Sequence, residues 1–405
     1  MDYDIIFRVI SMNTYYKKGR EIVKKLLDNG YQAFFVGGFV RDRLLGIEVN
    51  DIDITTNALP KAVQQLFQKT KATGVRYGTV TVFEDNHAYE VTTFRSDGQY
   101  SDHRKPDRVI FSDELSEDLK RRDFTINAFA MDYDERIIDL FSGREDLENH
   151  LIKAIGDPDQ RFDEDALRIL RAFRFVSKLG FQIEEKTFDS IQKNMHHLTA
   201  IANERILSEL KKIFGNPYAD QAVNLLHMSG FHKAFPELEK GIDFLKDITG
   251  YQLDYLEFFA LCFYLSDQSI PDDWRFSNKE RAIINKIIEL VTVTEEDTYN
   301  EMIIYRLGKD IPLMAAHVSR LLREDNDQSQ LIMDIYQKLP IRKTCDLKFK
   351  GQDILELTSL RNAEIIGEVI DDITYQVITG QLPNEYIPLK KYTLNLLEKK
   401  YGERQ

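Results

Sequence analysis

The hydrophobic residues of this 405-residue chain follow two different periodicities, and the change near residue 147 limits the folds that the chain can adopt. Before that point, short runs rich in β-branched and aromatic residues alternate with turn residues, as the strands of a sheet do. The predicted strands span residues 32–36, 52–55, 78–83 and 88–94. From residue 163 onward, apolar residues recur at spacings of three and four, which indicates helices. The predicted fold class is therefore α+β, with a small mixed sheet in an N-terminal domain and an all-helical C-terminal half.

Composition limits the kinds of molecule that the protein can bind and the cellular compartment in which it can work. At about 150 residues per domain, the chain is long enough for about two to four domains. Its formal charge of −13 argues against a generally basic coat for nucleic acids, although it permits local basic patches. Cys262 and Cys345 are too few for a disulfide framework or a tetrahedral zinc site. No apolar run approaches the roughly 18 residues that a membrane helix needs, so we expect a cytoplasmic protein with no membrane partner.

The densest group of chemistry-bearing residues begins with a glycine pair. Gly37 and Gly38 lie between a predicted strand and a predicted short helix, where backbone N–H groups can approach a phosphate closely. Asp51 and Asp53 follow, two apart on a strand, so both side chains point to one face while the neighbouring isoleucines point to the core. Adjacent carboxylates repel each other unless a cation lies between them, and oxygen ligands facing phosphate suit Mg²⁺. Metal-assisted phosphoryl transfer is the resulting hypothesis.

A third carboxylate belongs to the last of the predicted strands. Alternation along residues 89–94 places Glu90 on the face opposite Tyr89 and Val91. Three carboxylates on neighbouring strands could hold two metal ions ~3.5–4 Å apart, one activating an attacking hydroxyl and one bracing the leaving pyrophosphate. Each feature alone has a simpler explanation, because a glycine pair or an Asp-x-Asp is usually a turn with solvated acids, and Glu90 could be a surface charge. The hypothesis therefore depends on their combination.

A second cluster, at Asp165 and Arg168, could select a nucleotide by hydrogen-bond polarity. We expect a helix over residues 164–179, on which these two residues are three apart and share a face. Asp accepts hydrogen bonds and Arg donates them in a fixed fork, so the pair can accept from the amino group of cytosine or adenine and donate to the adjacent ring nitrogen. Uracil and guanine present the opposite polarity. On spacing alone, the simpler explanation is a set of intrahelical ion pairs worth ~0.2–0.5 kcal/mol each.

These residues belong to a longer series of motifs that resembles one known family. The series comprises Gly-Gly-x-Val-Arg-Asp at residues 37–42, Asp-x-Asp at 51–53, Tyr-Glu-Val-Thr-Thr-Phe at 89–94, and the runs 117–128 and 161–175. It is similar to the motifs of the bacterial class II CCA tRNA nucleotidyltransferases, which belong to the polymerase-β-like nucleotidyltransferase superfamily. The motifs cover about residues 34–215, whereas the C-terminal half matches in size and helical texture.

The resemblance implies an architecture, an activity and partners. The implied architecture is a polymerase-β-like catalytic head at residues 1–147, a helical neck at 148–215, a helical body at 216–300 and a helical tail at 301–405. The implied reaction is template-independent addition and repair of C, C and A at the 3′ end of tRNA from CTP and ATP, with two Mg²⁺ ions and release of pyrophosphate. The helical half would hold the acceptor and TΨC arms of the tRNA by backbone shape.

The resemblance also assigns roles to individual residues. The implied catalytic residues are Asp51, Asp53 and Glu90, with Asp51 and Asp53 as metal ligands. The implied nucleotide-binding residues are Gly38 and Arg41 at the phosphate pocket, Arg122 and Asp123 at phosphate and ribose, Asp165 and Arg168 at the base, and Arg171 and Arg174 at the triphosphate. A polar segment at residues 95–106, with Asp97, Tyr100, Asp102 and Arg104, corresponds to a flexible loop through which the family's pocket changes from C to A.

Two other functions stay open on the sequence alone. A bacterial poly(A) polymerase shares the head motifs, although it usually carries basic extensions that this acidic chain lacks. A non-catalytic RNA-binding protein could keep the same scaffold, although the presence of Asp51, Asp53 and the Asp165–Arg168 pair argues against one. The sequence leaves the oligomeric state open, a homodimer included.

The loop assignment yields a test. If residues 95–106 reshape the pocket after the second cytosine, deleting residues 97–102 should leave C addition intact and strongly reduce A addition. Single-turnover incorporation on tRNA ending at the discriminator base, and on tRNA ending in two cytosines, measures the two steps separately. Equal loss of both steps would show instead that the loop has a general role in folding or binding.

Overall fold

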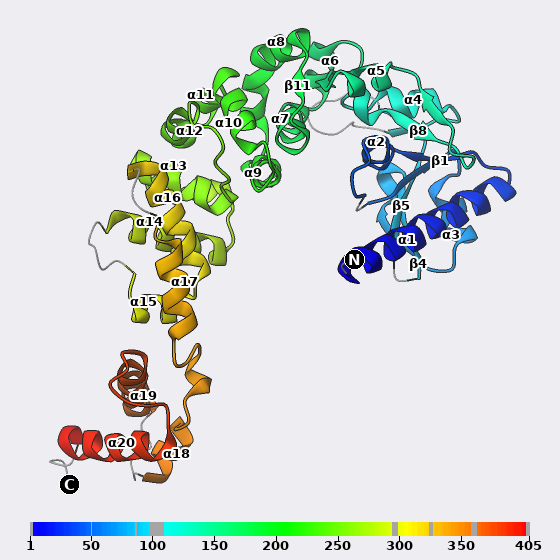
Figure 1. The fold of residues 1–405 in the computed structure, drawn as a ribbon. Coiled ribbons are helices and arrows are strands. Elements are labelled where there is room, and N and C mark those ends of the chain that lie inside the picture. Colours follow the sequence, from blue (N-terminus) through cyan, green and yellow to red (C-terminus); the bar gives the residue numbers. More distant parts are fainter. Residues whose placement is uncertain are drawn as a thin grey trace. The chain divides into compact units, whose positions relative to one another are not determined.

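The computed structural model describes residues 3–49, 51–85, 87–97, 109–293, 299–323, 327–357 and 363–401. The chain divides into two compact units, one comprising Met1–Tyr255 and Pro271–Arg275 and the other Leu256–Ile270 and Phe276–Gln405. The described strands all lie in the first unit, and the second unit is helical (Figure 1). This confirms the predicted fold class, whereas the division into head, neck, body and tail stays a prediction.

A mixed sheet of seven described strands forms the centre of the first unit, in the order β3-β4-β5-β2-β1-β8-β9. These strands are β1 (Ala33–Val36), β2 (Asp53–Thr56), β3 (Thr70–Gly74), β4 (Thr79–Glu84), β5 (His87–Thr93), β8 (Phe129–Met131) and β9 (Ile137–Asp139). Two small sheets pair β6 (Arg95–Asp97) with β7 (Val109–Phe111), and β10 (Leu151–Ile152) with β11 (Gln182–Ile183). All neighbours in the large sheet are antiparallel except β2 and β5, which run parallel with Asp53 opposite Glu90.

Four strands of the large sheet are the predicted ones, and their ends agree with the predictions within one residue. The sequence patterns do not predict the other three strands. The β8 segment, Phe-Ala-Met, is buried at every position and therefore shows no alternation. The outer strand β3 is mostly exposed and contains an irregularity in its pairing with β4.

Helices of the first unit pack around this sheet and continue the chain beyond it. They are α1 (Tyr3–Asp28), α2 (Gly38–Leu44), α3 (Pro60–Leu66), α4 (Leu115–Lys120), α5 (Gly143–Glu148), α6 (Pro158–Glu164), α7 (Leu167–Leu179), α8 (Glu185–Asn194), α9 (Asn203–Ile213), α10 (Ala219–Met228), α11 (Phe231–Ala234) and α12 (Glu239–Leu245). Short 3₁₀ turns are η1 (Val75–Tyr77), η2 (Thr125–Asn127), η3 (Met195–Ala200), η4 (Pro236–Leu238) and η5 (Asp272–Trp274). The long helix α1 contacts β1, β2 and α3 and buries Ile22, Val23 and Leu26.

Residues 164–179 do not form one continuous helix, so the prediction is wrong at its start. The helix α6 ends at Glu164, Asp165 is extended (φ −143°, ψ 99°), and α7 begins at Leu167. The Leu167 N–H donates a hydrogen bond to Asp165 Oδ1 (3.2 Å), a local bond that competes with helix continuation. The apolar side of α7 is as predicted, with Ile169, Leu170, Phe173 and Val176 buried. Asp165 therefore lies just before α7 and not on its face.

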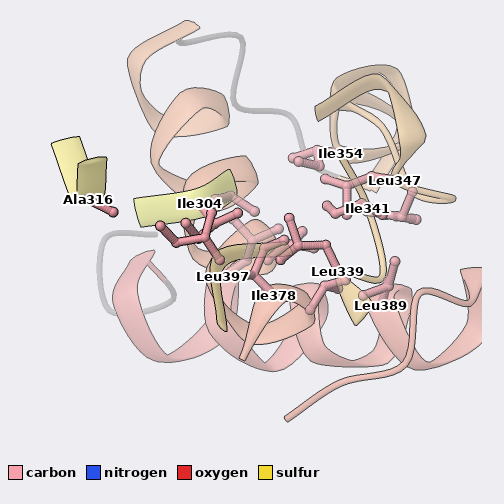
Figure 2. Packing of buried hydrophobic residues seen from close by; sticks show 14 residues of the cluster. Ile304, Ala316, Leu339, Ile341, Leu347, Ile354, Ile378, Leu389 and Leu397 are labelled. Carbon is pink, nitrogen blue, oxygen red and sulfur yellow. The ribbon is translucent and has the colours of Figure 1, made fainter. Parts of the chain in front are cut away.

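The second unit is built from α13 (Tyr255–Ser266), α14 (Asn278–Thr292), α15 (Glu301–Leu307), α16 (Asp310–Arg323), α17 (Ser329–Lys338), η6 (Thr344–Asp346), α18 (Gly351–Leu357), α19 (Ala363–Ile378) and α20 (Tyr386–Tyr401). Figure 2 shows part of its core, where Ile378 of α19 and Leu397 of α20 meet Ile304 of α15 and Leu339. Apolar side chains on helices of this length stabilise the unit by mutual burial. None of the described helices is long and apolar enough to cross a membrane.

Candidate functional site

The site begins at the turn between β1 and α2, which only a glycine can form without strain. Gly37 has φ +69° and ψ −136°, outside the range that most L-residues adopt. A Cβ at this position would lie 2.8 Å from Arg122 Nη1 and 3.9 Å from Asp53 Oδ2. The glycine therefore serves two purposes, because it makes the turn and it leaves room for a guanidinium beside the first residue of β2.

The three predicted catalytic carboxylates belong to adjacent strands: Asp53 begins β2 opposite Glu90 of β5, and Asp51 lies two residues before Asp53. Alternation is as predicted, because Ile52, Ile54, Tyr89 and Val91 are buried, whereas Asp51 and Glu90 are exposed and Asp53 is half-buried. The pKa of Asp53 is raised to about 6, chiefly by burial, which outweighs the lowering effect of the Arg122 charge; the charges of Glu90 and Asp51 add to the rise. The charged form of the Asp53 carboxylate is therefore less favourable here than in water.

Asp51 and Asp53 fit a hard divalent cation by their donor chemistry. Their oxygens are ligands that Mg²⁺ prefers, and a cation between them would offset the repulsion that raises the pKa of Asp53. Among the described residues, no group of three or more His, Cys, Asp and Glu side chains has the arrangement of a metal site. Mg²⁺ bound with a nucleotide commonly takes only one or two carboxylates, with phosphate and water completing its shell. A site with the two carboxylates of Asp51 and Asp53 agrees with that number of protein ligands.

Arg122 is oriented by a buried carboxylate that the sequence analysis did not assign. Asp118 on α4 is fully buried and accepts hydrogen bonds from Arg121 Nε (3.0 Å) and Arg122 Nη2 (3.3 Å). Burial alone would raise the pKa of Asp118, but the two guanidinium charges outweigh it and hold that pKa below its usual range. The spacing of three and four residues from Asp118 to the two arginines was the available signal for this group.

Asp123 links α7 to the part of the first unit that contains the seven-stranded sheet, here called the sheet domain. Its Oδ1 accepts hydrogen bonds from the Phe124 N–H (2.8 Å) and Asn127 Nδ2 (2.9 Å), and its Oδ2 accepts one from Arg171 Nε (2.7 Å). Burial would raise the pKa of Asp123, but the Arg171 charge and these hydrogen bonds hold it well below its usual range. Asp123 is therefore a permanent anion that fixes the position of Arg171.

Arg41 continues this network from α2. Its Nη1 donates to Asn127 Oδ1 (2.5 Å) and its Nε donates to Asp42 Oδ1 (2.8 Å). Asp42 Oδ2 in turn accepts a hydrogen bond from Lys178 Nζ on α7 (2.9 Å). The sheet domain thus holds α7 at Arg171 and at Lys178, two turns apart on one face of the helix.

Arg168 does not form a pair with Asp165 by a direct hydrogen bond. Its Nη1 donates to the Arg161 carbonyl (3.0 Å) and to Glu164 Oε2 (2.9 Å), and its Nη2 donates to the Arg121 carbonyl (2.9 Å). Glu164 and Arg168 do form an ion pair, but it joins α6 to α7 and is not within one helix. The guanidinium has five N–H groups, so these bonds fix its orientation and leave two donors for another molecule.

The guanidinium groups of Arg41, Arg171 and Arg174 all lie over the ring of Phe175, with centroid distances of 5.0, 5.7 and 5.0 Å. Arg174 Nη1 also donates to Glu209 Oε2 on α9 (3.0 Å). Burial and the charge of Arg171 lower the pKa of Arg174. The ring faces attract cations and keep like charges close together, which prepares a site for a polyanion.

One cavity of about 850 Å³ collects these residues. It is lined by all eleven predicted catalytic and nucleotide-binding residues, namely Gly38, Arg41, Asp51, Asp53, Glu90, Arg122, Asp123, Asp165, Arg168, Arg171 and Arg174. Ten Lys and Arg side chains line it against seven Asp and Glu side chains, so the cavity is basic although the chain carries −13 overall. A basic cavity with a patch of carboxylates on one wall suits a nucleoside triphosphate with its metal.

Other residues of the cavity were missed, and part of the predicted loop lies outside the described residues. Asn127, Phe175 and Lys178 line the cavity, but neither spacing nor residue type distinguishes them in the sequence. Of the predicted loop residues, Tyr100, Asp102 and Arg104 lie outside the described residues, and Asp97 ends β6.

Three family models match the chain. The model of the poly(A) polymerase head domain matches residues 33–153, the model of a probable RNA- and SrmB-binding site of polymerase A matches 180–242, and that of a putative tRNA nucleotidyltransferase domain 2 matches 257–391. The CCA-adding enzyme of Lactobacillus helveticus is 37% identical over 388 residues, which cover 94% of this chain and 97% of that protein. That of Staphylococcus saprophyticus is 36% identical over 402 residues, covering 94% and 98%.

A solved structure agrees with these relatives over nearly the whole chain. The crystal structure of the Bacillus stearothermophilus CCA-adding enzyme in complex with CTP is 32% identical, covers 96% of this chain and 99% of that one, and gives a TM-score of 0.80. The chain belongs to the CCA-adding enzyme family. The predicted family and the predicted tRNA nucleotidyltransferase activity are thereby confirmed. Because the relatives matched over nearly their full length are CCA-adding enzymes, that activity is favoured over a poly(A) polymerase or a non-catalytic RNA-binding protein.

The raised pKa of Asp53 predicts how this CCA-adding enzyme responds to pH without metal. The folded-state pKa of about 6 exceeds the ordinary value of 3.8, so the stabilisation from protonated Asp53 is fully present below about pH 4 and is lost by about pH 6. At pH 8 in EDTA, Asp53→Asn should therefore be about 1–3 kcal/mol more stable than the wild type, with the difference vanishing below about pH 4. Thermal unfolding across this pH range measures the effect.

Asp113→Asn, which neutralises an exposed carboxylate, controls for the change of net charge. Mg²⁺ should restore stability to the wild type and have little effect on Asp53→Asn. An Asp53→Asn protein that is no more stable than the wild type at pH 8 would show that the carboxylate is not strained in the metal-free site.

Proposed function

We propose that this chain completes and repairs the 3′ ends of tRNA, adding C, C and A from CTP and ATP in the cavity described above. The observation that carries this proposal is the convergence of three separated sequence motifs on one basic cavity, with every predicted catalytic and nucleotide-binding residue among its lining residues. In the reaction, the 3′ hydroxyl oxygen of the tRNA forms a bond to the α-phosphorus of the nucleotide, and the bond from that phosphorus to pyrophosphate breaks.

Asp51 and Asp53 are the residues that we assign to Mg²⁺. When bound, the metal supplies activation of the attacking hydroxyl and neutralisation of charge on the leaving pyrophosphate. Glu90, opposite Asp53 in the β2–β5 pairing, adds the third carboxylate on the wall that the 3′ end of the tRNA would approach. Two observations support this assignment: the register of β2 and β5 places Asp53 opposite Glu90, and the charges of Glu90 and Asp51 contribute to the raised pKa of Asp53.

The triphosphate would lie against the basic part of the cavity. Arg41, Arg171 and Arg174 are fixed around Phe175 by their partners Asp42, Asp123 and Glu209, so their positions do not depend on a ligand. Gly38 and Arg122 lie on the side of the carboxylates, where the turn at Gly37 leaves room for them. Preorganised guanidinium groups bind phosphate without the entropic cost of ordering long side chains.

Asp165 and Arg168 would read the base. Asp165 Oδ1 is held by the Leu167 N–H, and its Oδ2 makes no hydrogen bond with a described residue, so this oxygen can accept from an amino group. Arg168 retains two N–H groups that can donate to a ring nitrogen. This is the polarity that cytosine and adenine share, and uracil and guanine would place a carbonyl against the carboxylate.

The helical parts would bind the tRNA. We assign residues 1–147 to a catalytic head, 148–215 to a neck, 216–300 to a body and 301–405 to a tail, with the acceptor and TΨC arms held along the helical parts. Matches of residues 180–242 and 257–391 to models named for RNA binding and tRNA nucleotidyl transfer support this assignment. A cytoplasmic location follows from this substrate, and a homodimer stays a prediction.

Asp51→Ala tests the metal assignment. Incorporation of both C and A should fall below detection, because the proposed Mg²⁺ site loses one of its two carboxylate ligands, while binding of tRNA in a filter or gel-shift assay survives. Glu48→Ala, three residues upstream, exposed and outside the cavity, is the matched control and should keep full activity. Normal turnover by Asp51→Ala would overturn the assignment.

Arg168→Ala tests base reading. Loss of its donors should let UTP and GTP compete, reducing selectivity by about ten- to a hundredfold, because each unmet polar contact costs ~1–3 kcal/mol. Asp165→Asn should have a similar effect, since an amide offers both a donor and an acceptor. Single-turnover incorporation of all four nucleotides on one tRNA measures the selectivity.

The matched control is Arg144→Ala, which removes an exposed arginine that does not line the cavity. This control should retain strict selectivity for C and A. An Arg168→Ala enzyme that is slower yet equally selective would show that Arg168 has a structural role and that the base is read elsewhere.

A further inference from the structure

One hydroxyl group joins the two segments that carry the proposed catalytic carboxylates. Tyr15 lies on α1, before residues 33–153 that the head-domain model matches. Its hydroxyl accepts a hydrogen bond from the Ile52 N–H (3.3 Å) and donates one to the Ala88 carbonyl (3.2 Å). Ile52 lies between the two proposed Mg²⁺ ligands, and Ala88 precedes Glu90 by two residues. A side chain outside the motifs thus contacts the backbone on both sides of the carboxylates.

The hydroxyl of Tyr15 takes the place of one backbone hydrogen bond between the segments of β2 and β5. The described pairing of these parallel strands begins with Asp53 opposite Glu90. One residue further back, the same register puts Ile52 opposite Tyr89, and in a regular parallel ladder the Ile52 N–H would donate to the carbonyl of the preceding residue, Ala88. Two hydrogen bonds through the hydroxyl replace the single backbone bond of a regular ladder. The strands are therefore joined, but held apart, where the carboxylates leave the sheet.

Several contacts fix Tyr15 in this position. Its ring lies 4.8 Å from the rings of both Tyr89 and His87, and the Tyr89 hydroxyl donates to the Tyr15 carbonyl (2.8 Å). One turn later, a Cβ on Gly19 would lie 3.2 Å from Phe35 Cε1 and 3.4 Å from Tyr89 Cε1. The glycine thus allows α1 to approach the sheet closely, and the helix carries the hydroxyl as a rigid support.

We propose that Tyr15 is a positioning residue for nucleotidyl transfer. Its hydroxyl sets the separation of Asp51 and Asp53 from Glu90 and so determines how well the site takes a divalent cation. The inference rests on the proposed function, in which these carboxylates hold and surround Mg²⁺. Because the hydroxyl contacts neither the base-reading nor the phosphate-binding side chains, its loss should affect C and A addition equally.

Tyr15→Phe removes the hydroxyl and keeps the ring, and Tyr16→Phe is its matched control. Tyr16 is the next residue of the same helix, and its hydroxyl donates to the surface residue Glu135 (2.8 Å). In Tyr15→Phe, hydrogen–deuterium exchange of peptides containing the Ile52 amide should accelerate, since that amide loses its acceptor. The Mg²⁺ concentration for half-maximal addition should rise by about tenfold for both nucleotides, the usual consequence of removing an outer-shell partner of a metal ligand. Tyr16→Phe should change neither quantity.

The outcomes separate this inference from the proposed function. Unchanged exchange in Tyr15→Phe, or faster exchange with the same Mg²⁺ dependence as Tyr16→Phe, would overturn the positioning role while the wild type still adds C, C and A. A wild-type protein that adds no nucleotide would overturn the proposed function instead, and the exchange experiment would still report on the hydrogen bond. Faster exchange together with a raised Mg²⁺ requirement, equal for C and A, is the expected result.

Discussion

The geometry of the cavity depends on the buried carboxylate of Asp123. A buried charge is tolerated only when its hydrogen-bonding capacity is met, and Asp123 meets it from the Phe124 backbone, from Asn127 and from Arg171. Two of these partners belong to the sheet domain and the third to α7. The cost of leaving this anion unpaired therefore holds the sheet and the helix in one relative position. The position of Arg171 in the cavity is set by that joint.

Charge in the cavity is arranged in two opposing regions. The carboxylates of Asp51, Asp53 and Glu90 lie on or just before the adjacent strands β2 and β5, whereas the guanidinium groups around Phe175 lie toward α7. Each region is unfavourable alone, as the raised pKa of Asp53 and the lowered pKa of Arg174 show. A metal-bound triphosphate would relieve both at once, because its cation meets the carboxylates and its phosphates meet the guanidinium groups.

The sequence predicts those parts of the site that depend on local geometry. Alternation alone places the side chains of Asp51, Asp53 and Glu90 on the correct face, because a strand has a period of two residues. It cannot show that β2 and β5 are parallel neighbours, since pairing is a long-range property, nor that the three-residue strand β8 exists. The break at Asp165 was missed because a helical pattern of apolar residues continues across it, while a single side-chain hydrogen bond to Leu167 decides the local structure. The role of Tyr15 was missed because it too depends on long-range contacts: its hydrogen-bond partners Ile52 and Ala88 lie 37 and 73 residues away in the sequence.

Selection of a nucleotide without a template requires donors and acceptors that do not move. A flexible arginine could rotate to meet uracil or guanine, so polarity would confer little selectivity on its own. Arg168 is instead held by two backbone carbonyls and by Glu164, and Asp165 is held by the backbone of α7. The carbonyl groups come from α6 and from the end of α4, so the orientation of the guanidinium is set by the same packing that places Asp123. In the proposed function, base selectivity therefore depends on the same packing as the joint between the sheet and α7, and a substitution that loosens the joint should reduce selectivity even where it touches no nucleotide.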